Sequence, residues 1–176
     1  KCVESDFRLN DLLGSIRVML QPTAASKGVA FNVLVDAEVP VDLHGDADHL
    51  RQILVNLISN AIKFTERGGV TVSVERRSSS KIPDVVGHAN LLFSVRDTGI
   101  GIPLEAQHRI FEAFEQADSG HERRFGGTGL GTTIAKSLTE LLGGRIGFET
   151  VEGEGSNFWA EIPFRVNAVT EERPNP

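Results

Sequence analysis

The chain has 176 residues, a length that fits one domain with a hydrophobic core of ordinary size. Its 40% hydrophobic and 24% charged residues are typical of a soluble globular protein, and its formal net charge of −6 argues against binding to nucleic acid or to an anionic membrane surface. The single cysteine excludes an internal disulfide and favours a reducing compartment, and the sequence contains neither a membrane-spanning run nor a signal peptide. Because the chain starts at Lys1 without a Met, we expect it to be a piece of a longer protein.

The first third of the sequence predicts three strands and one helix. Alternation over residues 3–7 indicates a short strand, and leucines at helical spacing over residues 8–25 indicate a helix that Gly28 ends. Residues 29–35 indicate a second strand, and residues 41–43 indicate a third strand at an edge of the sheet.

Residues 46–65 predict a long helix with Asp46 as its N-cap. One face of this helix is apolar and is expected in the core, whereas the opposite face carries His49, Gln52, Asn56, Asn60 and Lys63. Asparagine is a mediocre helix former, so two asparagines four residues apart suggest a function. Their amide oxygens can bind a hard cation, and the nearby lysine can meet the anion that this cation carries. A solvated helix face is the alternative interpretation.

Two further strands are expected over residues 69–75 and 89–96, separated by a polar, exposed loop. In the second of them Leu91, Phe93 and Val95 share one face, and Asp97 falls on the same face at the end of the strand. A carboxylate that points toward the apolar side needs a hydrogen-bonding partner or a ligand.

The rest of the chain predicts a short helix beginning at Pro103, a glycine-rich charged loop over residues 117–129, a helix over residues 130–142, and a hairpin of residues 145–151 and 156–164. Phe111, Phe114 and Trp159 are expected in the core. Residues 165–176 lack core-forming periodicity and are expected to be a tail or an interdomain linker.

Two glycine motifs suggest a nucleotide site. In the D-x-G-x-G sequence that begins at Asp97, the carboxylate can accept a hydrogen bond from an exocyclic amine such as that of adenine, and the glycines leave room for a flat ring. The G-G-T-G-L-G sequence that ends at Gly131 leads into a helix, where backbone amides and the helix dipole favour phosphate. A plain turn and a flexible surface loop are the respective alternatives, and neither a P-loop nor a dinucleotide-binding motif is present.

The order of these motifs is more specific than any one of them. An N-x-x-x-N-A-x-K-F helix is followed by D-x-G-x-G, the Phe111 and Phe114 pair, G-G-T-G-L-G and finally G-x-G-S-x-F from Gly153 to Phe158. Together they closely resemble the ATP-binding domain of bacterial sensor histidine kinases, from Phe7 to about Phe164. The local sequence within these motifs is most similar to hybrid kinases, including the diffusible-signal-factor quorum-sensing type of plant-associated bacteria.

This resemblance implies an α/β fold, a two-layer sandwich of the Bergerat type with a mixed sheet, helices on one face and a mobile ATP lid. It implies that residues 1–164 form the catalytic domain, which binds Mg-ATP and donates the γ-phosphate to a histidine on a separate dimerisation hairpin, and that residues 165–176 lead toward a receiver domain. The expected partners are that hairpin and a receiver domain or response regulator, with no nucleic acid. A monomeric fragment of a homodimeric parent is expected, as a cytoplasmic domain of an inner-membrane-anchored sensor.

The resemblance also assigns roles to particular residues. It implies that Asn60 ligates Mg²⁺, that Asn56 helps directly or through water, and that Lys63 meets phosphate while Phe64 packs near the nucleoside. It implies that Asp97 accepts from the adenine amine, with Gly99 and Gly101 beside the ring and Ser156 supporting a bound water. The lid would be residues 117–127. The remaining assignments are γ-phosphate contacts by Arg123 or Arg124 and phosphate-binding amides at Gly127, Thr128, Gly129, Leu130 and Gly131.

Two departures from the family pattern stand out. Thr132 and Thr133 replace the Leu-Ala that the family has after its last glycine, and the hydroxyls are expected either to act as caps or to weaken helix packing, which puts the lid geometry in question. The phosphoacceptor histidine is also missing, since His121 lies in the glycine-rich loop. The other histidines lack metal-ligand spacing and are expected on the surface, at positions 44, 49, 88 and 108.

Two alternative functions are open at this point. A related ATPase of the gyrase, Hsp90 or MutL kind is one, but those enzymes place a glutamate that activates water one turn before the magnesium asparagine, where this chain has Asn56. A degenerate domain that serves as a regulatory or docking module without nucleotide is the other.

Overall fold

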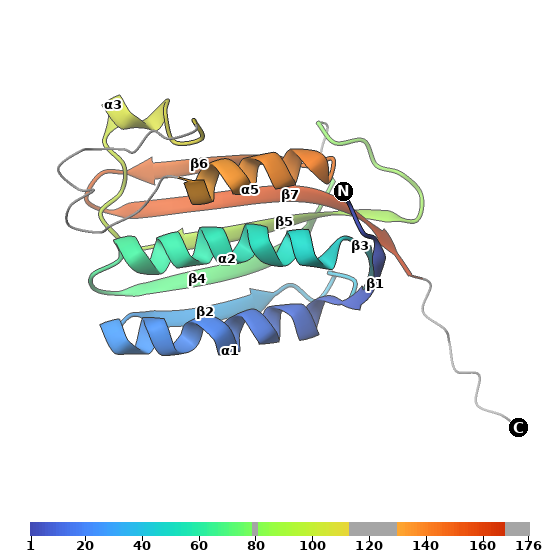
Figure 1. The fold of residues 1–176 in the computed structure, drawn as a ribbon, viewed down its shortest axis with the longest axis horizontal. Helices are drawn as coiled ribbons and strands as arrows, with labels where there is room; N and C mark the ends of the chain where they lie inside the picture. Colours follow the sequence, from blue (N-terminus) through green and yellow to red (C-terminus); the bar gives the residue numbers. More distant parts are fainter. Residues whose placement is uncertain (79–80, 113–129, 168–176) are drawn as a thin grey trace, which may run out of the picture.

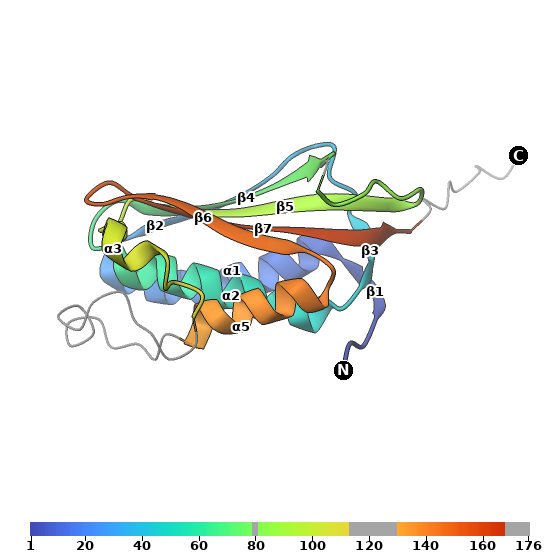
Figure 2. The ribbon, with the colours of Figure 1, turned by 90° about the horizontal axis from the view of Figure 1, so that it is seen from above.

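A seven-stranded mixed sheet forms one layer of the molecule, and helices α1, α2 and α5 cover one face of it (Figures 1 and 2). The structure is a computed structural model that describes residues 1–78, 81–112 and 130–167. Its elements are β1 (Ser5–Arg8), α1 (Leu9–Lys27), β2 (Ala30–Val35), β3 (Asp42–Gly45), α2 (Ala47–Phe64), β4 (Gly69–Arg77), β5 (His88–Asp97), α3 (Leu104–Gln107), α5 (Leu130–Leu141), β6 (Arg145–Val151) and β7 (Gly155–Val166). The predicted α/β sandwich with helices on one face is therefore confirmed.

The order of strands is β1-β3-β7-β5-β4-β2, and β6 also pairs with β7. Only the β2–β4 pair is parallel among these described pairs, and β3 and α2 form the crossover that a parallel pair needs. The prediction of an edge strand at residues 41–43 was wrong. That strand lies between β1 and β7, since β7 continues to Val166 and pairs its last residues with Leu43 and His44.

The core lies between the sheet and the helices. On α2, Leu50, Ile53, Leu54 and Leu57 are fully or almost fully buried, as the apolar face of the sequence predicts. The facing strands contribute alternate residues, as a period of two requires: Val70, Val72, Val74, Leu91, Phe93, Val95, Ala160, Ile162 and Phe164.

Helix α2 begins where predicted. Asp46 has extended backbone angles, and its Oδ1 atom accepts a hydrogen bond from the His49 N–H at 3.0 Å, which satisfies an amide that the first turn leaves without an intrahelical partner. Among the described residues, no helix is both long and apolar enough to cross a bilayer.

Trp159 does not lie in the core, contrary to the prediction. It sits between Phe158 and Ala160 on β7, so by alternation it points to the sheet face that the helices do not cover. There the Arg145 guanidinium lies 5.1 Å from its ring centroid, and Arg145 also pairs with the buried Glu161 carboxylate at 2.9 Å.

Replacing Leu54 by Ala should lower the free energy of unfolding by about 2 to 5 kcal/mol, because this side chain is fully buried and its loss leaves a cavity. The measurement is urea denaturation followed by circular dichroism. The same change at Leu104, which is 78% exposed, is the control and should alter the free energy by less than about 0.5 kcal/mol. Equal effects at both positions would contradict the described core.

Candidate functional site

The asparagine face of α2 lies against the first turn of α5. A Cβ placed on Gly131 would lie 3.5 Å from Asn60 Nδ2 and 4.0 Å from Asn56 Cβ, which shows how closely the backbone of α5 approaches the two asparagines. Asn56 Nδ2 is buried and has no hydrogen-bond partner among the described residues. A buried amide without a partner costs free energy. This face therefore fits a binding site for a polar ligand better than it fits a solvated surface.

Lys63 and Phe64 form the end of the same helix. Partial burial lowers the pKa of Lys63 from its ordinary value of 10.5, and the Nζ atom lies 5.5 Å from the Phe64 ring centroid. The Phe64 carbonyl accepts a hydrogen bond from the Ile100 N–H at 3.3 Å. The predicted phosphate lysine therefore lies beside the loop that follows Asp97.

Asp97 is a buried carboxylate with one oxygen fully engaged. Its Oδ1 atom accepts hydrogen bonds from the Gly99 N–H at 2.8 Å and from the Ser156 N–H at 3.3 Å, and the residue is only 7% exposed. Burial raises the pKa of Asp97 above its ordinary value of 3.8, although the two N–H donors oppose this effect. Among the described residues no donor contacts Oδ2, which leaves that oxygen available to a ligand.

Ser156 is held by a partner that the sequence interpretation missed. Its hydroxyl lies 2.7 Å from that of Thr150, and the Thr150 hydroxyl also donates to the Gly155 carbonyl at 3.1 Å. The register of the β6–β7 hairpin sets Thr150 opposite Ser156, so counting outward from the turn could have identified this pair. Thr150 also accepts from the Ile102 N–H at 3.0 Å, and it thereby joins the hairpin to the loop after Asp97.

The structure requires glycine at both glycine positions of the D-x-G-x-G sequence, independently of the predicted contact with a ring. A Cβ on Gly99 would overlap the Phe64 carbonyl oxygen and would lie 2.9 Å from Asp97 Oδ1. Gly101 has a φ of +67°, and its Cβ would overlap the backbone of Val151. Contact of either glycine with an adenine ring stays a prediction.

The unusual Thr132 and Thr133 have identifiable partners. The Thr132 hydroxyl donates to the Ile110 carbonyl at 2.8 Å, and the Thr133 hydroxyl donates to the Glu112 carbonyl at 3.2 Å. These bonds attach the first turns of α5 to the segment that follows α3. The departure from the family pattern therefore provides a tether at this edge of the site.

Phe111 packs in an aromatic cluster, with ring centroids 5.7 Å from Phe148 and 6.3 Å from Phe158. Leu130 begins α5 as predicted. The other predicted residues of this region lie outside the described residues: Phe114, the lid over 117–127, His121, Arg123, Arg124, Gly127, Thr128 and Gly129.

The sequence matches the family described as histidine kinase-, DNA gyrase B- and HSP90-like ATPase over residues 45–166. The chain belongs to this family. Within the family it is similar to sensory/regulatory protein RpfC of Xanthomonas campestris pv. campestris, with 50% identity over 161 residues that cover 92% of this chain and 22% of RpfC. The histidine kinase domain described here thus spans about a fifth of that relative's length.

Solved structures agree with this assignment. The structure of full-length ShkA in complex with AMPPNP matches with a TM-score of 0.78 and 34% identity, over 95% of this chain and 32% of ShkA. The catalytic domain of the histidine kinase ThkA matches with a TM-score of 0.69 and 28% identity, over 92% of this chain and 95% of that domain. The predicted family and the fold of a histidine kinase catalytic domain are confirmed.

Replacing Asp97 by Asn in this kinase domain should change how its stability depends on pH. Because burial raises the pKa of the folded-state carboxyl, wild type loses stability as the pH rises through that pKa, whereas the Asn variant has no charge to bury there. We expect the variant to gain stability relative to wild type as the pH rises from about 4 through the raised pKa of Asp97, and the stability difference to stop changing with pH below the ordinary Asp pKa.

Urea denaturation at several pH values measures this effect, and Asp36→Asn, at an exposed position that follows β2, is the matched control for an Asp-to-Asn change. If wild type instead gained stability over Asp97→Asn with rising pH, the two N–H donors would outweigh burial, and the assigned cause of the pKa shift would be wrong.

Proposed function

We propose that this domain binds Mg-ATP and presents the γ-phosphate to a histidine outside the chain. The observation that carries the proposal is the Asp97 carboxylate, whose Oδ1 atom holds two backbone N–H groups while Oδ2 has no donor among the described residues. A buried carboxylate is costly without a partner, and the exocyclic amine of adenine is a donor from which Oδ2 can accept a hydrogen bond.

The phosphates would lie toward the asparagine face of α2. Asn60 and Asn56 would hold Mg²⁺, which neutralises phosphate charge when bound, and amide oxygens are ligands that this cation accepts. The unpaired amide of Asn56 fits this group, because it can turn its oxygen to a cation or its NH₂ to a phosphate oxygen. Lys63 would contact phosphate, and the backbone at Gly131 would contribute amide donors at the start of α5.

Phosphoryl transfer demands positioning and charge neutralisation more than covalent chemistry from the protein. Asn56 stands where a hydrolysing relative would carry a general base, so bound nucleotide would be hydrolysed slowly. Arg123 or Arg124 would reach the γ-phosphate. We propose that the acceptor histidine lies on a dimerising hairpin of a longer protein, and that a receiver domain follows the linker formed by the last residues. Anchoring of that protein in a membrane stays a prediction.

Calorimetric titration with a non-hydrolysable ATP analogue, with and without Mg²⁺, tests the phosphate end of the site. Wild type should bind more tightly with Mg²⁺, and Asn60→Ala should lose most of this dependence because it removes a metal ligand. Asn10→Ala, an exposed asparagine at the start of α1, is the matched control and should bind as wild type does. A folded wild type that binds no nucleotide would refute the proposal.

Adenine recognition by Asp97 is tested by changing both the side chain and the nucleotide base. Asp97→Asn should weaken binding of the ATP analogue by about tenfold or more, because the Asn amide would point a donor at the adenine amine. The same variant should bind better than wild type to the corresponding inosine nucleotide, whose purine carries a carbonyl oxygen at that position. Equal losses of affinity for the adenine and inosine nucleotides would mean that Asp97 supports the structure of the site but does not distinguish the bases.

A further inference from the structure

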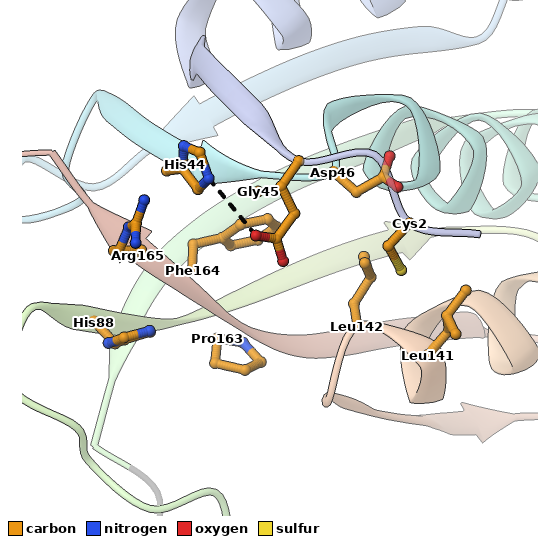
Figure 3. Close-up of a pocket in the computed structure, with 11 residues that line it drawn as sticks. Cys2, His44, Gly45, Asp46, His88, Leu141, Leu142, Pro163, Phe164 and Arg165 are labelled. Atoms are coloured by element: carbon orange, nitrogen blue, oxygen red, sulfur yellow. Dashed lines mark ion pairs between the residues drawn. The ribbon is translucent and has the colours of Figure 1, made fainter.

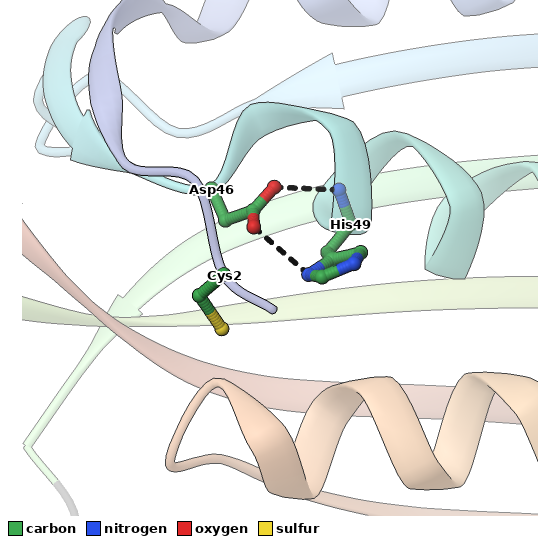
Figure 4. A group of neighbouring side chains, drawn as sticks. All are labelled: Cys2, Asp46 and His49. Carbon is green, nitrogen blue, oxygen red and sulfur yellow. Dashed lines mark hydrogen bonds and ion pairs between the residues drawn. The ribbon is translucent and has the colours of Figure 1, made fainter.

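The first turn of α2 holds a group of side chains that the nucleotide site does not use. Cys2, Asp46 and His49 each offer one ligand atom, and these atoms all lie within 4.8 Å of one another (Figure 4). His49 precedes Asn56 by seven residues, which corresponds to about 10 Å along the helix axis. The group is therefore separate from the asparagines proposed to hold Mg²⁺. Spacing in the sequence could not indicate this group, because Cys2 and His49 are 47 residues apart.

Asp46 positions the group. Its side chain is almost fully buried, its Oδ1 atom accepts from the His49 N–H at 3.0 Å, and its Oδ2 atom accepts from the Val3 N–H at 2.8 Å. The bond from Val3 holds the segment before β1 against the start of α2, and this places the exposed Cys2 beside the helix. The Asp46 side chain thus holds His49, and Val3 next to Cys2, through their backbone N–H groups.

The ligand atoms of His49 and Asp46 are close, but they do not form a hydrogen bond of good geometry. His49 Nδ1 lies 2.9 Å from Asp46 Oδ2, yet it is buried without a partner in hydrogen-bonding geometry among the described residues. Two ligands of one tetrahedral zinc ion lie about 3.4 Å apart, given metal–ligand bonds of about 2.1 Å. A small opening of this pair would therefore place both atoms around a single cation.

A cavity of about 280 Å³ borders two of the three residues of the group (Figure 3). Cys2 and Asp46 line it, together with Glu4, His44 and Arg165. It leaves room beside Cys2 and Asp46 for a water molecule, which zinc sites with three protein ligands take as the fourth ligand.

We propose that Cys2, Asp46 and His49 bind a divalent cation of intermediate softness such as Zn²⁺, with water in the fourth position on the cavity side. A thiolate, an imidazole and a carboxylate are all zinc ligands, whereas Mg²⁺ prefers oxygen and avoids sulfur. Binding would release the thiol proton and would join residue 2 to the first turn of α2.

Titration of the reduced 176-residue chain with Co²⁺ as a spectroscopic substitute, followed by Zn²⁺ competition, tests this site. Cys2 is the only cysteine, so a sulfur-to-cobalt charge-transfer band reports on this residue alone. We expect one metal ion per chain, displacement of cobalt by Zn²⁺, and loss of the band in Cys2→Ala. His49→Gln should weaken Zn²⁺ binding by about tenfold or more, since even outer-shell changes often reach that size.

The controls separate this site from its surroundings. His88→Gln, at the wall of the cavity but outside the group, should bind Zn²⁺ as wild type does. Asp46→Asn keeps an N-cap acceptor while it weakens the ligand, and its circular dichroism spectrum verifies folding. Asn60→Ala should retain Zn²⁺ binding, so that failure of the nucleotide proposal and failure of this one are distinguishable. Binding that survives both Cys2→Ala and His49→Gln, or one metal ion per two chains, would overturn the proposal.

Discussion

The packing of α2 against the sheet is the constraint on which both proposed sites depend. Its apolar side chains must face the strands, because burial of such side chains is the main favourable contribution to folding. The rotation of the helix about its axis is then determined, and Asn56 and Asn60 are directed toward α5. The same rotation directs Asp46 and His49, which are neighbours in the first turn, toward the first residues of the chain. One helix thereby supports polar chemistry at two separate turns.

Burial of the Asp97 carboxylate costs free energy, and it occurs at a position suited to ligand binding. The alternation of β5 directs a carboxylate toward the core, and its burial opposes ionisation. Gly99, Ser156 and Thr150 compensate only in part, since they occupy or support one side of the carboxylate. A residue that existed only for stability would be better replaced by a neutral one, so its charge is more readily explained by recognition.

Much of this organisation follows from local patterns in the sequence. The period of two was enough to place Asp97 with Val95 on the buried face, and capping chemistry was enough to place Asp46 before α2. Features that depend on distant pairing could not be found this way. The interior position of β3 needs Val166 on β7, and the approach of Cys2 to His49 needs a hydrogen bond between Val3 and Asp46. Trp159 has the hydrophobicity of a core residue, but the alternation of β7 puts it on the sheet face opposite to Ala160 and Ile162.

The position of β7 has a consequence for how the chain acquires its structure during synthesis. It is the last strand along the described sequence, yet it pairs with β3, β5 and β6 and lies inside the sheet. A nascent chain that has not yet reached residue 155 leaves β5 without this neighbour and Leu91 and Phe93 incompletely covered. Such long-range pairing slows folding and exposes intermediates to aggregation. The domain must therefore complete its core after nearly all of it has left the ribosome, as one cooperative unit.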